Sequence, residues 1–212
     1  MRWRTPFSCI LAGPSRAGKT TFVYNLLLYS DVLLDNKPDK IIYYYNHWQP
    51  LFIDMRDKGL VHKFVNGLPT QEELEGESKP GKHTLIVIDD FMNVASDHVS
   101  NIFTALSHHL SLSCVFISQN LFARNNKYMR DMSLSATHLV LFKNPRDQSQ
   151  IVSLARQLSP GNARYIIDGF RDITKKPYSY VVFDLHQATP EELRVRSHIF
   201  PHEQPAVAIL PI

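Results

Sequence analysis

The sequence lacks the features that mark membrane, repeat or secreted proteins. No apolar run approaches the ~20 residues that a membrane span needs. We find no internal repeat and no low-complexity tract, and residues 1–4 lead directly into an apolar run rather than a secretory signal peptide. We therefore expect a soluble, intracellular protein that does not contact a membrane.

Cysteine is scarce, because the chain has only Cys9 and Cys114. Both lie in apolar runs typical of buried strands, where a thiol more often fills core space than joins a disulfide or a metal site. We interpret the compartment as reducing.

An excess of charge of one sign is also missing, since 23 Lys and Arg against 20 Asp and Glu leave a formal net charge of +3. Dedicated nucleic-acid domains usually carry a stronger basic stripe. The composition therefore permits a nucleic-acid partner without indicating one. The length of 212 residues suits one α/β domain and is short for two.

Strand-like apolar runs alternate with helical patterns, which predicts an α/β fold with a mostly parallel central sheet flanked by helices on both faces. We expect residues 178–185 to be the last strand, Thr189–Glu192 to begin a helix, and residues 201–212 to form a proline-containing tail or docking arm after a domain of residues 1–200. The expected strands are residues 7–12, 41–45, 61–65, 84–88, 114–118, 138–142 and 178–185.

The strongest motif follows the first expected strand and opens a helix. It fits the phosphate-loop pattern G-x-x-x-x-G-K-[ST] without deviation, in the structural context that the mechanism requires. Backbone N–H groups of such a loop and the positive end of the next helix bind phosphates. The motif predicts ATP binding, with Lys19 at the β and γ phosphates and Thr20 as a ligand of Mg²⁺. The expected nucleotide-binding residues are Gly13, Pro14, Ser15, Arg16, Ala17, Gly18, Lys19, Thr20 and Thr21.

Two acids, Asp89 and Asp90, end the buried run of residues 84–88. In an open parallel sheet this end of a strand faces the ligand crevice. We expect Asp89 to hold Mg²⁺ through water and Asp90 to orient the attacking water or accept its proton. A plainer alternative is that the pair caps the following helix.

Polar residues that follow the later strands are further candidates for catalytic or nucleic-acid-binding roles. An amide such as Gln119 can contact both a γ-phosphate and the attacking water, although Ser and Asn nearby also favour a plain turn. Arg146 and Arg124 are our candidates for an arginine that a neighbouring subunit supplies to the transferring phosphoryl group. Arg124, Lys127, Tyr128 and Arg130 form a mixture that could equally contact a nucleic-acid backbone.

The phosphate loop, Asp89-Asp90 and Ser118-Gln119-Asn120 together resemble the FtsK–HerA branch of RecA-like, additional-strand (ASCE) P-loop ATPases. More narrowly, they are similar to the short genome-packaging ATPases of double-stranded DNA viruses of the poxvirus and adintovirus-like kind. The stretch of residues 42–50 and the run from His108 to Asp147 share this resemblance, which covers most of residues 5–200.

The resemblance implies a motor that assembles into a ring of about five or six subunits and pumps double-stranded DNA. It also implies an arginine acting in trans, a capsid protein as a partner, and a location in the host nucleus or cytoplasm or with the virion. The strand of Cys114 is expected between those of Cys9 and Asp89. The chain departs from the family where Asp90 replaces a frequent Glu and where Ser107–His109 lacks a frequent arginine.

Two other functions remain open from the residues alone. The fold would also suit a phosphotransferase of the nucleotide-kinase kind, which transfers a phosphoryl group to a small acceptor. A nucleotide-gated assembly module that binds ATP with little turnover would need the loop but not Asp90.

Overall fold

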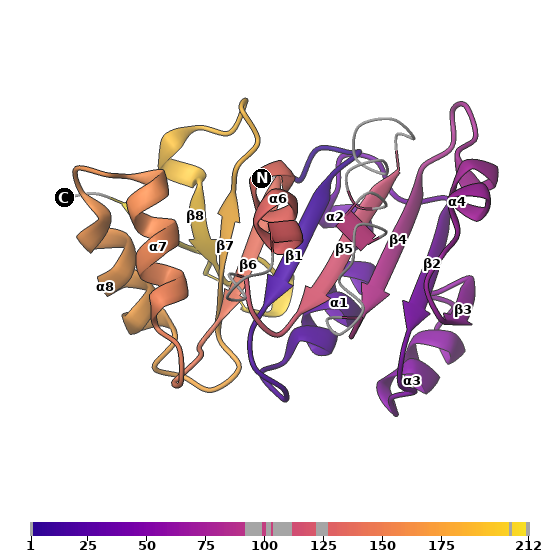
Figure 1. Cartoon of the computed structure of the whole chain (residues 1–212), viewed down its shortest axis with the longest axis horizontal. Helices are drawn as coiled ribbons and strands as arrows, with labels where there is room; N and C mark the ends of the chain where they lie inside the picture. Colours follow the sequence, from indigo (N-terminus) through magenta and orange to yellow (C-terminus); the bar gives the residue numbers. More distant parts are fainter. Residues whose placement is uncertain are drawn as a thin grey trace.

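The computed structural model describes residues 2–91, 99–100, 103, 112–121, 127–203 and 205–210. Within these ranges, nine strands form one twisted sheet in the order β3-β2-β4-β5-β1-β6-β7-β8-β9 (Figure 1). The strands are β1 (Ser8–Ala12), β2 (Lys40–Tyr45), β3 (Lys63–Asn66), β4 (Thr84–Asp89), β5 (Ser113–Ser118), β6 (His138–Phe142), β7 (Tyr180–Asp184), β8 (Val195–Ser197) and β9 (Val207–Ala208).

The strands from β3 to β6 in this order are parallel, and the pairs β6–β7, β7–β8 and β8–β9 are antiparallel. The predicted mostly parallel sheet is therefore confirmed. β5 lies between β1 and β4, as the family resemblance implied for the strands of Cys114, Cys9 and Asp89. This order brings the carboxyl ends of three parallel strands to one edge of the sheet.

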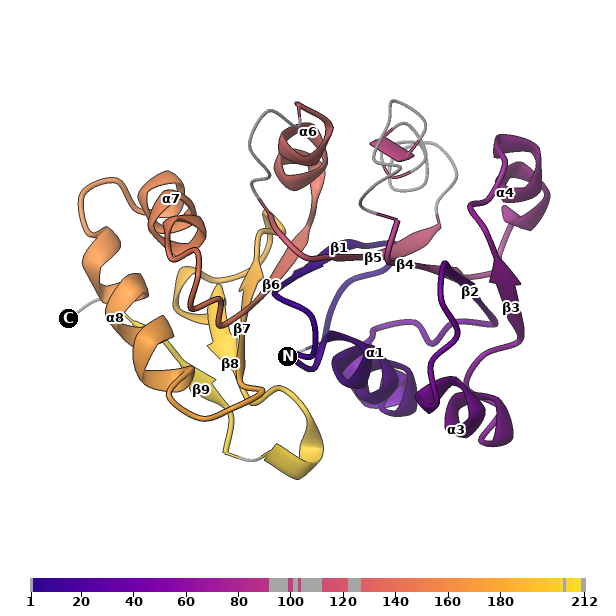
Figure 2. The ribbon, with the colours of Figure 1, turned by 60° about the horizontal axis from the view of Figure 1, so that its bottom comes forward.

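Helices cover both faces of the sheet, as predicted (Figure 2). Strands β1, β4 and β5 are buried at every position, because their apolar side chains pack alternately into the cores above and below them. None of the helices in the described ranges is long and apolar enough to cross a membrane. One face carries α1 (Lys19–Leu28), α2 (Ser30–Leu33) and α3 (Leu51–Asp57); the other carries α4 (Gln71–Glu77), α6 (Lys127–Ser135), α7 (Ser149–Leu158) and α8 (Ala163–Ile173).

The antiparallel edge after β6 corrects two predictions from the sequence. β7 is not the last strand, since the three-residue β8 and the two-residue β9 follow it. Thr189 does not begin an α-helix, because its hydroxyl donates to Asp184 Oδ1 at 2.8 Å and only one 3₁₀ turn, Glu191–Leu193, follows. Asp184 also accepts from Arg196 Nη2 at 2.8 Å, and this buried ion pair joins β7 to β8.

The expected tail or docking arm of residues 201–212 contributes Ile209 to one core, and Phe200, the residue just before it, belongs to the core on the other face of the sheet. Phe200 is 1% exposed and packs edge-to-face on Phe22 of α1, with ring centroids 5.0 Å apart. Ile209 is 8% exposed and lies against α8, where a Cβ added to Gly169 would come within 2.7 Å of Ile209 Cγ2. Residues 201–203 and 205–210 therefore pack as part of the domain, although no periodicity in the sequence marks them.

Ile209→Ala should lower the free energy of unfolding by about 2 kcal/mol, because it removes buried methyl groups at a contact that is already close. Urea denaturation followed by circular dichroism measures this change. Leu210→Ala is the matched control, since Leu210 is 49% exposed and its loss should change stability by less than about 0.5 kcal/mol. Equal effects of the two substitutions would contradict the packing described here.

Candidate functional site

The loop after β1 has the backbone shape that anion binding requires. Arg16 has a φ of 64° and Gly18 a φ of 100°, so the chain turns twice into the left-handed region before α1 begins at Lys19. Such turns bring successive amides around a concave space. At the other end of the loop, a Cβ on Gly13 would lie 2.7 Å from Phe142 Cβ, so this position has no room for a larger residue.

Lys19 is held inside its own loop. Its ammonium group donates to the carbonyl oxygens of Gly13 at 2.6 Å and Pro14 at 2.8 Å. Burial lowers the pKa of Lys19, and the nearby carboxylates of Asp89 and Asp90 act in the opposite direction. Contacts to the β and γ phosphates would require Lys19 to exchange these two carbonyl oxygens for phosphate oxygens.

The side chain of Asp89 is a desolvated carboxyl group that accepts hydrogen bonds from two neighbouring side chains. It is 3% exposed, and its Oδ2 accepts from the Tyr43 hydroxyl at 2.9 Å and from Gln49 Nε2 at 3.1 Å. Burial raises the pKa of Asp89 to about 6, while Tyr43, Lys19 and Gln49 oppose the increase. Within the described ranges, neither hydrogen bond uses Oδ1, which leaves an oxygen for a cation.

Asp90 and Gln119 complete the arrangement predicted from the sequence. Asp90 is partly buried and has a φ of 65°, a conformation that Asp tolerates better than most residues. Gln119 is exposed and directly follows β5. The carbonyl of Ser118 accepts from the Gly13 amide at 3.3 Å, so the end of β5 is tied to the start of the phosphate loop.

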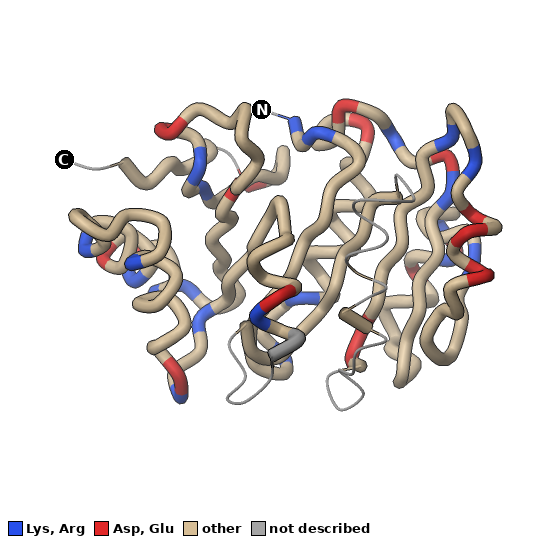
Figure 3. The backbone as a smooth tube through the Cα atoms, turned by 45° about the horizontal axis from the view of Figure 1, so that its top comes forward, with Lys and Arg blue, Asp and Glu red and all other residues tan. Residues whose placement is uncertain are grey.

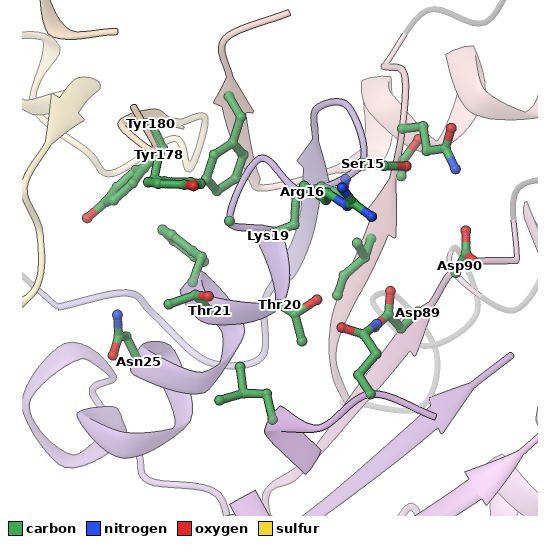
Figure 4. Close-up of a pocket in the computed structure, with 18 of the residues that line it drawn as sticks. Ser15, Arg16, Lys19, Thr20, Thr21, Asn25, Asp89, Asp90, Tyr178 and Tyr180 are labelled. Atoms are coloured by element: carbon green, nitrogen blue, oxygen red, sulfur yellow. The ribbon is translucent and has the colours of Figure 1, made fainter. Parts of the chain in front are cut away.

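One cavity of about 870 Å³ brings these groups together (Figure 4). It is lined by Lys19, Thr20, Asp89, Asp90 and Gln119 from three neighbouring strand ends. Of the remaining loop positions that we predicted, Ser15, Arg16, Gly18 and Thr21 line the same cavity. The oxygen donors of Thr20 and Asp89 on one wall suit Mg²⁺, which prefers oxygen ligands.

The sequence did not identify several residues that line this cavity or contact its acids. Tyr43 and Gln49 reach Asp89 from β2 and from the turn before α3, and neither belongs to a motif with a known role. Tyr178, Phe200 and His202 also line the cavity and come from the C-terminal part of the chain. Only the general resemblance of residues 42–50 pointed toward any of them.

Of the two arginine candidates, Arg146 alone lies in the described residues, and it does not line this cavity. Arg146 is exposed in the turn after β6, and its backbone amide donates to Asn144 Oδ1 at 3.1 Å. It does not line the cavity of its own chain, so a role in trans stays a prediction. Arg124 lies outside the described residues, as do His108 and His109.

No family model and no curated sequence matches this chain. Among solved structures, the genome-packaging NTPase B204 of Sulfolobus turreted icosahedral virus 2, in complex with ATP-γS, shares 15% identity over 97% of this chain and 98% of that chain, with a TM-score of 0.49.

Two Thermomonospora curvata structures are also similar. One contains EccC ATPases 2 and 3 with a signal-sequence peptide, with 13% identity, a TM-score of 0.41 and coverage of 64% of this chain and 30% of that one. The other is the cytoplasmic domain of the type VII secretion ATPase EccC, with 15% identity, a TM-score of 0.43 and coverage of 67% and 20%. This chain thus spans less than a third of each EccC chain.

The fold itself is that of the P-loop NTPase class. A phosphate loop joins β1 to α1, a mostly parallel sheet lies between helices, and β5 separates β1 from the strand that carries Asp89.

Asp89→Asn should make the nucleotide-free protein more stable at neutral pH. In the unfolded chain this carboxyl ionises near pH 4, but in the folded chain it ionises near pH 6. The wild type therefore loses stability, relative to the variant, as pH rises from about 4 to about 6, and keeps that deficit at higher pH. Urea unfolding at pH 7.5 should show a gain of about 2–3 kcal/mol for the variant, shrinking below pH 6.

Asp90→Asn is the matched control, because Asp90 is partly exposed and Asn tolerates its positive φ. We expect it to change the free energy of unfolding by less than about 0.5 kcal/mol, both at pH 7.5 and below pH 6. A variant Asp89→Asn that is less stable than the wild type at pH 7.5 would show that the buried carboxylate is stabilised rather than penalised.

Proposed function

We propose that this chain is an ATPase that binds Mg·ATP in the cavity and hydrolyses it. The supporting observation is the convergence of the phosphate loop, Asp89, Asp90 and Gln119 on one cavity at the edge formed by β1, β5 and β4. A phosphate loop alone would suit a binding protein. The acids and the amide opposite it supply what hydrolysis additionally requires, which is a group that positions water.

Each residue has a defined task in this reaction. The loop amides and Lys19 bind the triphosphate, with Lys19 pairing with the β and γ phosphates. Gln119 orients the attacking water, and Asp90 accepts its proton as the water oxygen bonds to the γ-phosphorus. The bond from that phosphorus to the β–γ bridging oxygen breaks, and ADP leaves with the electron pair.

Thr20 and Asp89 would hold the magnesium ion, with Tyr43 and Gln49 fixing the orientation of the Asp89 carboxylate. An ion held there would supply positive charge to offset that of the phosphate oxygens. The described residues contain no group of three or more His, Cys, Asp or Glu side chains that could hold a metal alone.

The work driven by hydrolysis is, in our proposal, the movement of double-stranded DNA into a viral capsid by a ring of subunits. The sequence resemblance of the motifs supports this part. Over the described residues, Lys and Arg are interspersed with Asp and Glu on the outer helices and turns rather than gathered into one stripe (Figure 3). A ring that lines its pore with the same few cations from every subunit would bind DNA without such a stripe.

Lys19→Ala and Asp90→Asn should separate binding from hydrolysis. Lys19→Ala should weaken ATP binding and abolish phosphate release, because the β and γ phosphates lose the ammonium group that pairs with them. Asp90→Asn should bind ATP with nearly unchanged affinity but hydrolyse it at least ~100-fold more slowly. Calorimetry with a non-hydrolysable ATP analogue and a phosphate-release assay, each with and without duplex DNA, measure the two effects. Lys82→Ala, at an exposed lysine paired with Asp39, is the control.

The same assays distinguish the alternatives. Transfer of labelled γ-phosphate to a nucleoside or sugar instead of water would identify a phosphotransferase. Full function in Asp90→Asn would favour an assembly module with little turnover. Hydrolysis by assembled rings that duplex DNA does not stimulate would contradict the DNA-translocating part of the proposal.

The hydrolysis lost in Arg146→Ala should be restored by mixing in subunits that carry Arg146, because Arg146 does not line the cavity of its own chain. We expect rings of this variant to bind ATP normally and hydrolyse it slowly, since they lack a cation at the transferring phosphoryl group. Adding Lys19→Ala subunits, which carry Arg146 but an inactive loop, should restore part of the phosphate release. Rescue of Arg124→Ala but not Arg146→Ala would assign the role to Arg124 instead.

A further inference from the structure

The cavity has two chemically different ends, and they fix the direction in which a nucleotide lies. Asp89, Asp90 and Gln119 surround one end, where the γ-phosphate must be hydrolysed. Figure 4 shows Tyr178 and Tyr180 on the opposite side of the phosphate loop from Asp89 and Asp90. A triphosphate held by the loop with its γ end at the acids therefore directs its sugar and base toward Tyr178.

Tyr178 combines two features that are unusual for a tyrosine with no role. Its side chain is 73% exposed, and its backbone has a φ of 64°, a conformation that bulky residues rarely adopt. A Cβ built on Gly18 would lie 3.6 Å from Tyr178 Cβ, so this tyrosine stands beside the turn that begins α1. Strained residues persist where the surrounding structure or a function requires them.

Aromatic side chains continue from Tyr178 along this end of the cavity. Tyr180 is 4% exposed, and its hydroxyl donates to Glu203 Oε2 at 2.5 Å. The same carboxylate oxygen accepts from the Phe200 amide at 3.2 Å, which fixes the 3₁₀ turn Pro201–Glu203. The ring of His202 is parallel to that of Phe200, with centroids 5.8 Å apart. Aromatic surfaces of this kind bind the faces of nucleobases by stacking.

We infer that this end of the cavity is a base-binding site, in which Tyr178 stacks on the nucleobase and the turn of residues 200–203 closes the wall behind it. This inference rests on the proposed function, since it names the part of the same cavity that binds the base. It assigns to the C-terminal segment a direct part in nucleotide binding. It also accounts for an exposed tyrosine held at a positive φ.

The test compares a nucleotide with a ligand that lacks the base. Calorimetry in Mg²⁺ measures the dissociation constants of a non-hydrolysable ATP analogue and of inorganic tripolyphosphate for the wild type, Tyr178→Gly and Tyr178→Phe. Glycine adopts the positive φ freely, so the turn should keep its shape and the variant its thermal stability. We expect Tyr178→Gly to bind the ATP analogue roughly tenfold more weakly and tripolyphosphate unchanged. Tyr178→Phe should bind both ligands like the wild type.

Leu134→Ala, which removes a 68% exposed side chain from α6 and away from the cavity, should change neither constant. Unchanged binding of the ATP analogue by Tyr178→Gly would overturn the base site and leave the proposed ATPase intact. Equal weakening of both ligands would also overturn it, because Tyr178 would then act through the phosphate loop. A wild type that binds neither ligand would overturn the proposed function together with this inference.

Discussion

The site depends on a constraint of sheet topology, which is the placement of β5 between β1 and β4 with all three strands parallel. Parallel neighbours end at the same edge, so the phosphate loop, Gln119 and the two acids meet there although they lie far apart in the sequence. The hydrogen bond from the Gly13 amide to the Ser118 carbonyl fixes the loop against the end of β5. A change in strand order would separate these groups even if every motif were retained.

Burial of the Asp89 carboxylate lowers the stability of the nucleotide-free protein above pH 6. The carboxylate is almost fully desolvated, and two neutral donors, Tyr43 and Gln49, only partly compensate for the lost water. A cation at this position would supply the missing charge. Gln49 connects the acid to the turn that precedes α3.

The sequence predicted the features that depend on local patterns. Continuous apolar runs identified the central strands, and fixed spacing identified the loop from Gly13 to Thr20. It could not predict Tyr43 and Gln49 as partners of Asp89, because that contact follows from the pairing of β2 with β4. It also missed α8 and the short strands β8 and β9, whose positions are set by packing on distant residues, as Ile209 against Gly169 shows. The part that Tyr178 and residues 200–203 play in lining the cavity was missed for the same reason.

A crystal structure with Mg²⁺ and a non-hydrolysable ATP analogue would test the central claim most directly. The account predicts that Lys19 Nζ leaves the carbonyl oxygens of Gly13 and Pro14 for phosphate oxygens, and that the γ-phosphate lies between the loop and the Asp89–Asp90 end of β4. Triphosphate bound elsewhere on the domain, with Lys19 still on the two carbonyl oxygens and Asp89 far from any phosphate, would contradict it.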